Sequence, residues 1–250
     1  MADPKTTRVT AILAVVALLA VIVLASMVQL FGSGSNEEPG DTPGEASTPE
    51  TTDADARSAG ECNEPPALPA SPPSFGEVPD QKLAEGAIWE ATVGTNCGDI
   101  VFELYGDKAP QTVSSFVFLA EEGYWKDSPC HRLVPQGIFV LQCGDPTGTG
   151  TGDPGYGYGI ENAPVDGNYP RGTLAMARTA DPNTNGGQFF IVFQDSALPV
   201  EGGGYSIFGK VVAGMDIVDR IAESGLGGQV GPEAPARPIS ILDVTMEKKS

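Results

Sequence analysis

Residues 183–191 read NTNGGQFFI and residues 130–145 read CHRLVPQGIFVLQCGD, and in both stretches a short apolar run follows glycine. Further short apolar runs occupy residues 173–177, 206–211 and 239–246. Such runs, bounded by turn-forming residues, are typical of β-strands. Because helices do not alternate with them, they predict a closed or nearly closed antiparallel barrel rather than an α/β fold.

The rest of this region adds a hairpin and two helices. Residues 89–104 alternate apolar and polar side chains on either side of the turn sequence GTNCGD, which predicts a β-hairpin with one buried face. A helix is expected over residues 110–120, with proline near its start and Gly123 after its end. A second helix fits residues 215–223, whose apolar side chains share one side.

The composition excludes several classes of function. The 250 residues include 14 lysines and arginines against 33 aspartates and glutamates, a formal net charge of −19. Binding to nucleic acid needs a basic surface, which so acidic a chain does not provide. The single histidine argues against a His-rich metal centre. The four cysteines include no CxxC pair, which argues against thiol–disulfide exchange. We therefore expect no cofactor.

Residues 9–31 form a 23-residue run without a charged side chain. At about 1.5 Å per residue, a helix of this length crosses a hydrocarbon core of roughly 30 Å. Lys5 and Arg8 precede the run and acidic residues follow it, so we expect residues 1–8 in the cytoplasm and the remainder outside. This predicts a single-pass protein of the cell membrane with an extracytoplasmic domain. The alternative is a cleaved signal peptide, whose apolar region is normally shorter.

Residues 32–84 are expected to form an acidic, proline-rich, disordered linker. Between residues 32 and 80 there are 11 acidic residues, nine prolines and one basic residue, Arg57. Such a segment buries too little apolar surface to offset the entropy of ordering the chain. A plain spacer is the favoured interpretation, and a partner-binding tail is the alternative. The folded domain would then occupy residues 85–250.

Three segments carry a more specific pattern: residues 130–145, residues 174–191 and residues 205–211, which read YSIFGKV. Together they resemble the cyclophilins, the cyclosporin-binding class of peptidyl-prolyl cis-trans isomerases. The similarity runs from about residue 89 to residue 246. It implies a mainly β fold, an eight-stranded antiparallel barrel capped by two α-helices, with a substrate groove on its outer face. An exported member on a short acidic linker suits a bacterium.

The resemblance also assigns roles by position in the motifs. Arg132 matches the catalytic arginine. The groove residues that it implies are Phe139, Gln142, Met176, Ala177, Gln188, Phe190, Leu198 and Tyr205.

Four positions differ from the best-known members of the family. Val140 stands in place of a methionine and Arg178 in place of an asparagine. Ala197 stands in place of a tryptophan that contacts cyclosporin, and Tyr205 in place of a pocket histidine. The last two changes predict that cyclosporin binds weakly.

The chemistry of an X-Pro peptide bond calls for these residue types. Its rotational barrier, roughly 18–20 kcal/mol, reflects lost C–N resonance, and uncatalysed exchange takes tens to hundreds of seconds. A dry pocket can hold the proline ring, while a fixed donor such as the Arg132 guanidinium bonds to the prolyl nitrogen as the amide twists. We therefore expect a monomeric isomerase that acts on proline-containing segments of exported proteins.

Simpler interpretations exist for the same residues. A groove of this kind could hold proline-containing segments without catalysis, as a chaperone or scaffold module, although binding alone does not need Arg132. A lone arginine in a strand is usually a surface charge. Cys130 and His131, as neighbours in a strand, would point to opposite faces, which argues against a Cys–His dyad. Residues 148–152, GTGTG, lack the lysine of a phosphate-binding loop.

The four cysteines of an exported domain would be oxidised and allow three pairings. In the barrel that the resemblance implies, Cys130 and Cys143 lie on successive strands beside Arg132, so we favour this pair. Cys62 with Cys97 would then join the end of the linker to the first hairpin. The alternative is free, buried thiols.

Overall fold

The structure is a computed structural model that describes residues 61–249. The predicted cytoplasmic N-terminus (1–8), the predicted membrane helix (9–31) and most of the predicted linker lie outside the described residues. Within residues 61–249, no helix is both long enough and apolar enough to cross a bilayer.

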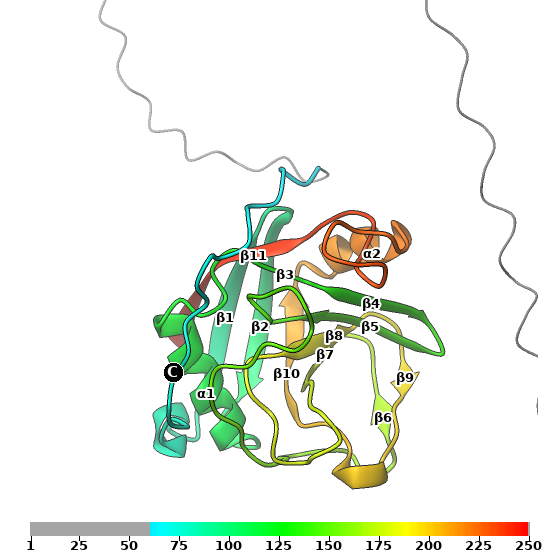
Figure 1. Cartoon of the computed structure of the whole chain (residues 1–250). Helices are drawn as coiled ribbons and strands as arrows, with labels where there is room; N and C mark the ends of the chain where they lie inside the picture. The colour runs from blue at the N-terminus through cyan, green and yellow to red at the C-terminus, as the bar shows by residue number, and fades with distance from the viewer. Residues whose placement is uncertain (1–60, 250) are drawn as a thin grey trace, which may run out of the picture. The chain divides into compact units, whose positions relative to one another are not determined.

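The main feature is a strongly curled antiparallel sheet (Figure 1). Its strands follow the order β3-β11-β1-β2-β10-β7-β8-β5-β4. Their bounds are β1 (Ile88–Thr95), β2 (Gly98–Tyr105), β3 (Ser128–Pro129), β4 (Arg132–Gln136), β5 (Ile138–Cys143), β7 (Thr173–Met176), β8 (Phe189–Val192), β10 (Ile207–Ala213) and β11 (Ser240–Lys248).

The expected number of eight strands is wrong for this sheet, which has nine. The reason is a break at Cys130 and His131, which divides one extended segment into β3 and β4. These two strands form the opposite edges of the sheet, so a single short segment links both edges and the sheet curls towards closure. A separate two-stranded sheet pairs β6 (Asn168–Tyr169) with β9 (Ser196–Ala197).

Both predicted α-helices are present and pack against the curled sheet. Helix α1 (Pro110–Glu121) begins at a proline. Proline is well tolerated there, because the first N–H groups of a helix have no acceptor within the helix. Helix α2 (Met215–Glu223) buries Ile217, Val218 and Ile221. Two short 3-10 helices, η1 (Gln81–Ala84) and η2 (Glu201–Gly203), complete the described helices.

The pleat of the sheet separates two apolar clusters. The interior cluster includes Phe189, whose ring centroid lies 5.8 Å from that of Phe116 on α1. The next residue, Phe190, belongs to an outer cluster, and its centroid lies 5.7 Å from that of Tyr205. Successive side chains of a strand point to opposite faces, so two neighbouring phenylalanines serve two different packing layers.

The C-terminal part of the predicted linker is ordered, which corrects the expected domain boundary at residue 85. Cys62 is bonded to Cys97, and the Asn63 N–H donates to the Asn96 carbonyl over 2.8 Å. The Phe75 ring packs at 4.9 Å from the Phe118 ring. A disulfide bond and one partly buried aromatic ring fix this segment to the domain, although the average composition of residues 32–84 does not indicate it. The folded part therefore extends at least from residue 61.

Candidate active site

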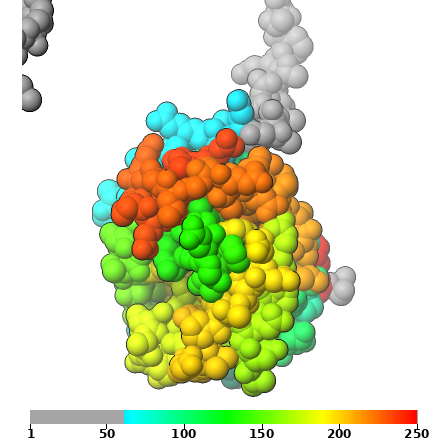
Figure 2. Space-filling model, turned by 90° about the vertical axis from the view of Figure 1, so that its right-hand side faces the viewer, coloured from blue at the N-terminus to red at the C-terminus, as the bar shows by residue number. Residues whose placement is uncertain are grey.

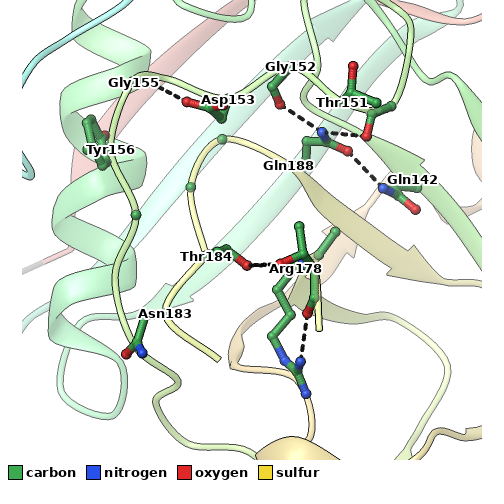
Figure 3. Close-up of a pocket in the computed structure, with 16 residues that line it drawn as sticks. Gln142, Thr151, Gly152, Asp153, Gly155, Tyr156, Arg178, Asn183, Thr184 and Gln188 are labelled. Atoms are coloured by element: carbon green, nitrogen blue, oxygen red, sulfur yellow. Dashed lines mark hydrogen bonds between the residues drawn. The ribbon is translucent and has the colours of Figure 1, made fainter. Parts of the chain in front are cut away.

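The site is built around Arg132, the first residue of β4. It stands directly opposite Gln142 of β5 in the antiparallel register, so both side chains lie on one face of the sheet. Arg132 Nη1 donates to Gln142 Oε1 over 3.3 Å, and Gln142 Nε2 donates to Gln188 Oε1 over 2.9 Å. Figure 3 shows the second of these bonds. A row of hydrogen bonds thus runs across the site from the guanidinium.

Gln188 fixes the far end of this row to a glycine-rich loop. Its Nε2 donates to the carbonyl oxygens of Gly150 (3.1 Å) and Gly152 (2.8 Å), contacts that are drawn in Figure 3. Because the amide nitrogen is engaged on the loop, its Oε1 is the atom that faces Gln142. The row therefore has a defined direction, with each amide nitrogen donating away from Arg132.

Asp145 holds this loop in place from beneath. Its fully buried carboxylate accepts hydrogen bonds from the backbone N–H groups of Thr147 (2.8 Å), Gly150 (2.7 Å) and Gly152 (3.1 Å). Burial raises the pKa of Asp145, but hydrogen bonds from the Thr147 side chain and from these backbone groups outweigh it and hold the pKa below its usual range. A buried, charged carboxylate thus organises the loop on which Gln188 rests.

An apolar patch lies beside Gln142 on the same outer face. Its core is the outer cluster, whose buried members are Val140, Tyr169, Ala175, Phe190, Val192 and Leu198. The small sheet of β6 and β9 borders it, because Tyr169 ends β6 and Leu198 follows β9. The Tyr169 hydroxyl donates to the Tyr205 carbonyl (2.9 Å) and accepts from its N–H (2.8 Å), which ties Tyr205 to the patch.

A hollow of about 550 Å³ adjoins the patch. It is lined by Gln142, Gln188 and residues 177–179, together with residues 150–153, 155–157, 183–184 and 186–187 (Figure 3). Backbone and neutral polar groups form most of this wall. The face therefore combines the Arg132 guanidinium, an apolar patch and a mostly neutral polar hollow with Arg178 in its wall. This arrangement suits an extended peptide with one apolar ring.

The chain was compared with known proteins. Residues 91–246 match the family described as "Cyclophilin type peptidyl-prolyl cis-trans isomerase/CLD". The chain belongs to the cyclophilin family.

Individual relatives agree. The "Probable peptidyl-prolyl cis-trans isomerase B" of Mycobacterium tuberculosis is 40% identical over 206 residues, covering 74% of this chain and 64% of the relative. A "Peptidyl-prolyl cis-trans isomerase" of Helicobacter pylori is 40% identical over 152 residues, 60% of this chain and 89% of the relative. A crystal structure of a Cryptosporidium parvum cyclophilin is 32% identical with a TM-score of 0.55, covering 65% of this chain and 99% of that one. This chain thus spans less than two thirds of its mycobacterial relative.

Most of the site residues predicted from the cyclophilin motifs lie together. Arg132, Gln142 and Gln188 form the row of hydrogen bonds described above. The remaining predicted residues at the patch and its margin are Ala177, Phe190, Leu198 and Tyr205.

Two predicted groove residues lie elsewhere. Phe139 is one position out of phase with Gln142 on β5, so the pleat places it on the opposite face, where its ring packs at 5.9 Å from Phe193. Met176 is 3% exposed and belongs to the interior cluster, paired with Phe189. In this structure neither side chain lies on the face that carries Gln142, because a motif gives a place in the chain and not a side of the sheet.

Two further residues lie at the patch of this cyclophilin although they were not predicted as groove residues. Val140 was noted only as a departure, yet it occupies the patch position assigned to Phe139, and counting alternate residues back from Gln142 could have shown this. Arg178 covers the Tyr205 ring with its guanidinium carbon 5.0 Å from the centroid, and its Nε donates to the Gly204 carbonyl over 2.9 Å. It thereby braces the turn that leads into Tyr205.

The cysteines of this cyclophilin pair as predicted. Cys130 is bonded to Cys143 and Cys62 to Cys97. The first bond joins Cys130, two residues before Arg132, to Cys143, the residue after Gln142. It therefore lies next to the hydrogen-bonded pair of Arg132 and Gln142. A bonded Cys130 is no nucleophile, which removes the Cys–His dyad.

His131 has a structural environment rather than a reactive one. Its side chain is 7% exposed, neither ring nitrogen has a hydrogen-bond partner within the described residues, and burial lowers its pKa. Among residues 61–249, no group of three His, Cys, Asp or Glu side chains is placed to hold a metal ion.

Proposed function

We propose that this chain accelerates cis-trans rotation of X-Pro peptide bonds in exported proteins. The observation that carries the proposal is the position of Arg132 on the same face of the sheet as the apolar patch, with Gln142 between them. A proline ring seated on the patch would bring its own amide towards the guanidinium. Family membership supports the same activity.

The proposed mechanism is stabilisation of the twisted amide. Rotation removes C–N resonance, and the prolyl nitrogen then becomes a hydrogen-bond acceptor that neither planar form offers. A guanidinium N–H of Arg132 can donate to it, since arginine keeps its charge and its planar fork of donors at any ordinary pH. An interaction made only in the twisted state lowers the barrier without deepening the ground states. No proton is transferred and no covalent bond forms.

The substrate class is proposed from the same geometry. The patch accommodates the proline ring, and the neighbouring hollow of about 550 Å³ accommodates the residues beside it. A solved structure of the Cryptosporidium parvum relative was determined in the presence of the dipeptide Ala-Pro, with 34% identity and a TM-score of 0.54 to this chain. Apart from Asp153 and Arg178, backbone and neutral side chains line the hollow, which favours a broad choice of flanking residues.

The test is the isomerisation rate of an Ala-Pro peptide with the full chain and with Arg132→Ala. Removing a donor that acts only in the transition state typically costs about 100- to 1,000-fold in rate, and we expect a loss of that order. A second variant, Arg132→Lys, keeps the charge but not the fork and should recover only part of the rate. Equal rates for the wild type and Arg132→Ala would contradict the mechanism.

The alternative is a module that binds proline-containing segments without catalysis. Such a module needs the apolar patch but has no use for a cation held in register by Gln142 and Gln188. The same assay separates the two functions, because a binding module would bind the peptide without accelerating its exchange.

We further propose that the domain acts outside the cytoplasm, held at the cell membrane by residues 9–31. Two disulfide bonds support an oxidising compartment. The test is the mass of the membrane-extracted full chain. A full-length mass would support the anchor, whereas loss of the first 30 or so residues would favour the cleaved signal peptide.

A further inference from the structure

Arg132 has a second partner, from a loop that the sequence motifs do not include. Arg132 Nε donates to Glu233 Oε2 over 3.2 Å, while its Nη1 donates to Gln142 Oε1 over 3.3 Å. Glu233 lies between α2 and β11, about a hundred residues further along the chain. Two different parts of the fold therefore hold two different nitrogens of the same guanidinium.

The backbone of this loop is fixed beside β4. The Leu133 N–H, next to Arg132, donates to the Glu233 carbonyl over 2.8 Å. The following residue, Ala234, is 2% exposed, and its carbonyl accepts from the N–H groups of Gly227 (3.0 Å) and Gly228 (3.1 Å). In Figure 2 the orange segment of the C-terminal part lies against the green β4–β5 region. The Glu233 carboxylate thus starts from a backbone position that is anchored next to its partner.

The two contacts leave one end of the guanidinium open. Within the described part of the chain, Nη2 has no acceptor, and the Arg132 side chain is 40% exposed. An arginine held at Nε and at Nη1 cannot rotate its plane freely, whereas one held at Nη1 alone can. Fixing the plane in advance lowers the entropy that must be lost when the free N–H groups meet the twisted amide.

We propose that Glu233 is a positioning residue that, together with Gln142, orients the Arg132 guanidinium so that Nη2 faces the groove. This rests on the proposed function of Arg132. Glu233 contacts no substrate in this scheme and acts through the arginine alone. Its carboxylate is 71% exposed, so the contact is an exposed ion pair of moderate strength that salt should weaken.

The variants test whether Glu233 acts by accepting a hydrogen bond from Arg132 Nε or by its negative charge. Glu233→Ala removes the acceptor, while Glu233→Gln retains an oxygen that can accept from Nε. Asp216→Ala is the matched control, because Asp216 pairs with Arg220 over 2.6 Å and is similarly exposed at 69%, but lies on α2 and does not contact Arg132. Unfolding curves check that all variants remain folded.

Two measurements are made on the full chain. The first is kcat and KM for an Ala-Pro peptide: Glu233→Ala should lower kcat about two- to five-fold with KM little changed, as expected for an exposed pair that matters in the transition state. Glu233→Gln should keep a clearly larger share of the wild-type kcat than Glu233→Ala, and Asp216→Ala should keep all of it. The second is the NMR signal of the Arg132 Nε–H, assigned by its loss in Arg132→Lys, which should shift and exchange faster in Glu233→Ala.

The outcomes separate this inference from the proposed function. An unchanged or higher kcat in Glu233→Ala would overturn it, and so would equal losses in the Ala and Gln variants, because the oxygen would then not be the working feature. An undisturbed Arg132 Nε–H signal in Glu233→Ala would also overturn it. Absence of any isomerase activity in the wild type would instead remove the proposed function, while the NMR signal would still report the contact.

Discussion

Two neighbouring side chains of strand β8 pack on opposite faces of the sheet. Phe189 packs inside the barrel against Phe102, Phe116 and Trp125, whereas Phe190 lies on the outer patch with Tyr205. The period of two in a strand is the whole cause of this division. It provides a matched pair of substitutions that differ by one position.

We expect Phe189→Ala to lower the free energy of unfolding by about 3–5 kcal/mol, the usual cost of removing a buried phenylalanine ring. The protein that remains folded should bind an Ala-Pro peptide as the wild type does. Phe190→Ala should weaken peptide binding at least ten-fold, because it removes a ring of the patch on which we propose that proline sits. Urea unfolding and peptide titration by NMR measure both quantities. Equal losses of binding in the two variants would contradict the assignment of the outer face.

The site could be predicted from sequence where a motif names a residue type with a specific chemistry. Motif matching named Arg132, Gln142, Gln188 and Phe190, and these four residues lie close together in the structure. Motif matching grouped Phe139 with Gln142, although the two are three residues apart and so point to opposite faces of β5. Only the register of β4 and β5 shows which face each residue takes. Glu233 carries no signal in the sequence, because it stands in a loop rich in glycine and proline without hydrophobic periodicity.

At the scale of elements, the two disulfides differ in how close they lie to Arg132 and Gln142. Cys130–Cys143 closes 13 residues and joins β5 to the residue just before His131-Arg132, whereas Cys62–Cys97 closes 35 residues and ties the N-terminal segment to the β1–β2 turn. Both should stabilise the fold. Only the first borders Arg132 and Gln142.

We expect the double variant Cys130→Ala/Cys143→Ala to lose about 2–5 kcal/mol of stability and to lose kcat as well, because the ends of β4 and β5 become free to separate. Cys62→Ala/Cys97→Ala is the control, with a similar loss of stability and an unchanged kcat. Unfolding curves and isomerisation rates below the unfolding transition distinguish them. A full kcat in the first variant would show that the bond has no part in positioning the arginine.

Amino-acid composition did not predict which part of the linker is held against the domain. The longer strands and both helices were predicted because each has its own periodicity or its own turn and capping residues, whereas the two-residue strands β3, β6 and β9 were not. Residues 61–84 have no hydrophobic periodicity, and contacts with distant residues such as Asn96, Phe118 and Pro154 hold them in place. Averages taken along the chain cannot reveal contacts of this kind.

For the whole molecule, the buried titratable groups predict lower stability in acid. Burial lowers the pKa of His131 in the folded chain. Just below the ordinary pKa of histidine, the His131 side chain is therefore protonated in the unfolded chain but still neutral in the folded chain. The unfolded state therefore gains protons first as the pH falls below about 6.5, the ordinary pKa of histidine, and stability decreases from there. The lowered pKa of Asp145 acts in the same direction at lower pH, since its charged form is stabilised only in the folded loop.

Urea unfolding at pH 7.5 and at pH 5.5 measures this effect. We expect the wild type to be less stable at pH 5.5, and His131→Gln to lose less stability than the wild type between the two values. The comparison is between pH values within each protein, so any cost of the substitution itself cancels. A wild type that is equally stable at both values would contradict the buried, neutral state of His131.

The central claim is that Arg132 acts on the rotating amide and not on binding. The most direct measurement is NMR exchange spectroscopy of an Ala-Pro peptide, which gives the cis-trans rate and the dissociation constant in one sample for the wild type and for Arg132→Ala. The account predicts a loss of catalysed exchange of about 100-fold or more, with a dissociation constant changed by less than about five-fold, because the apolar patch remains. Catalysed exchange that persists in Arg132→Ala, or that falls only in proportion to lost binding, would contradict it.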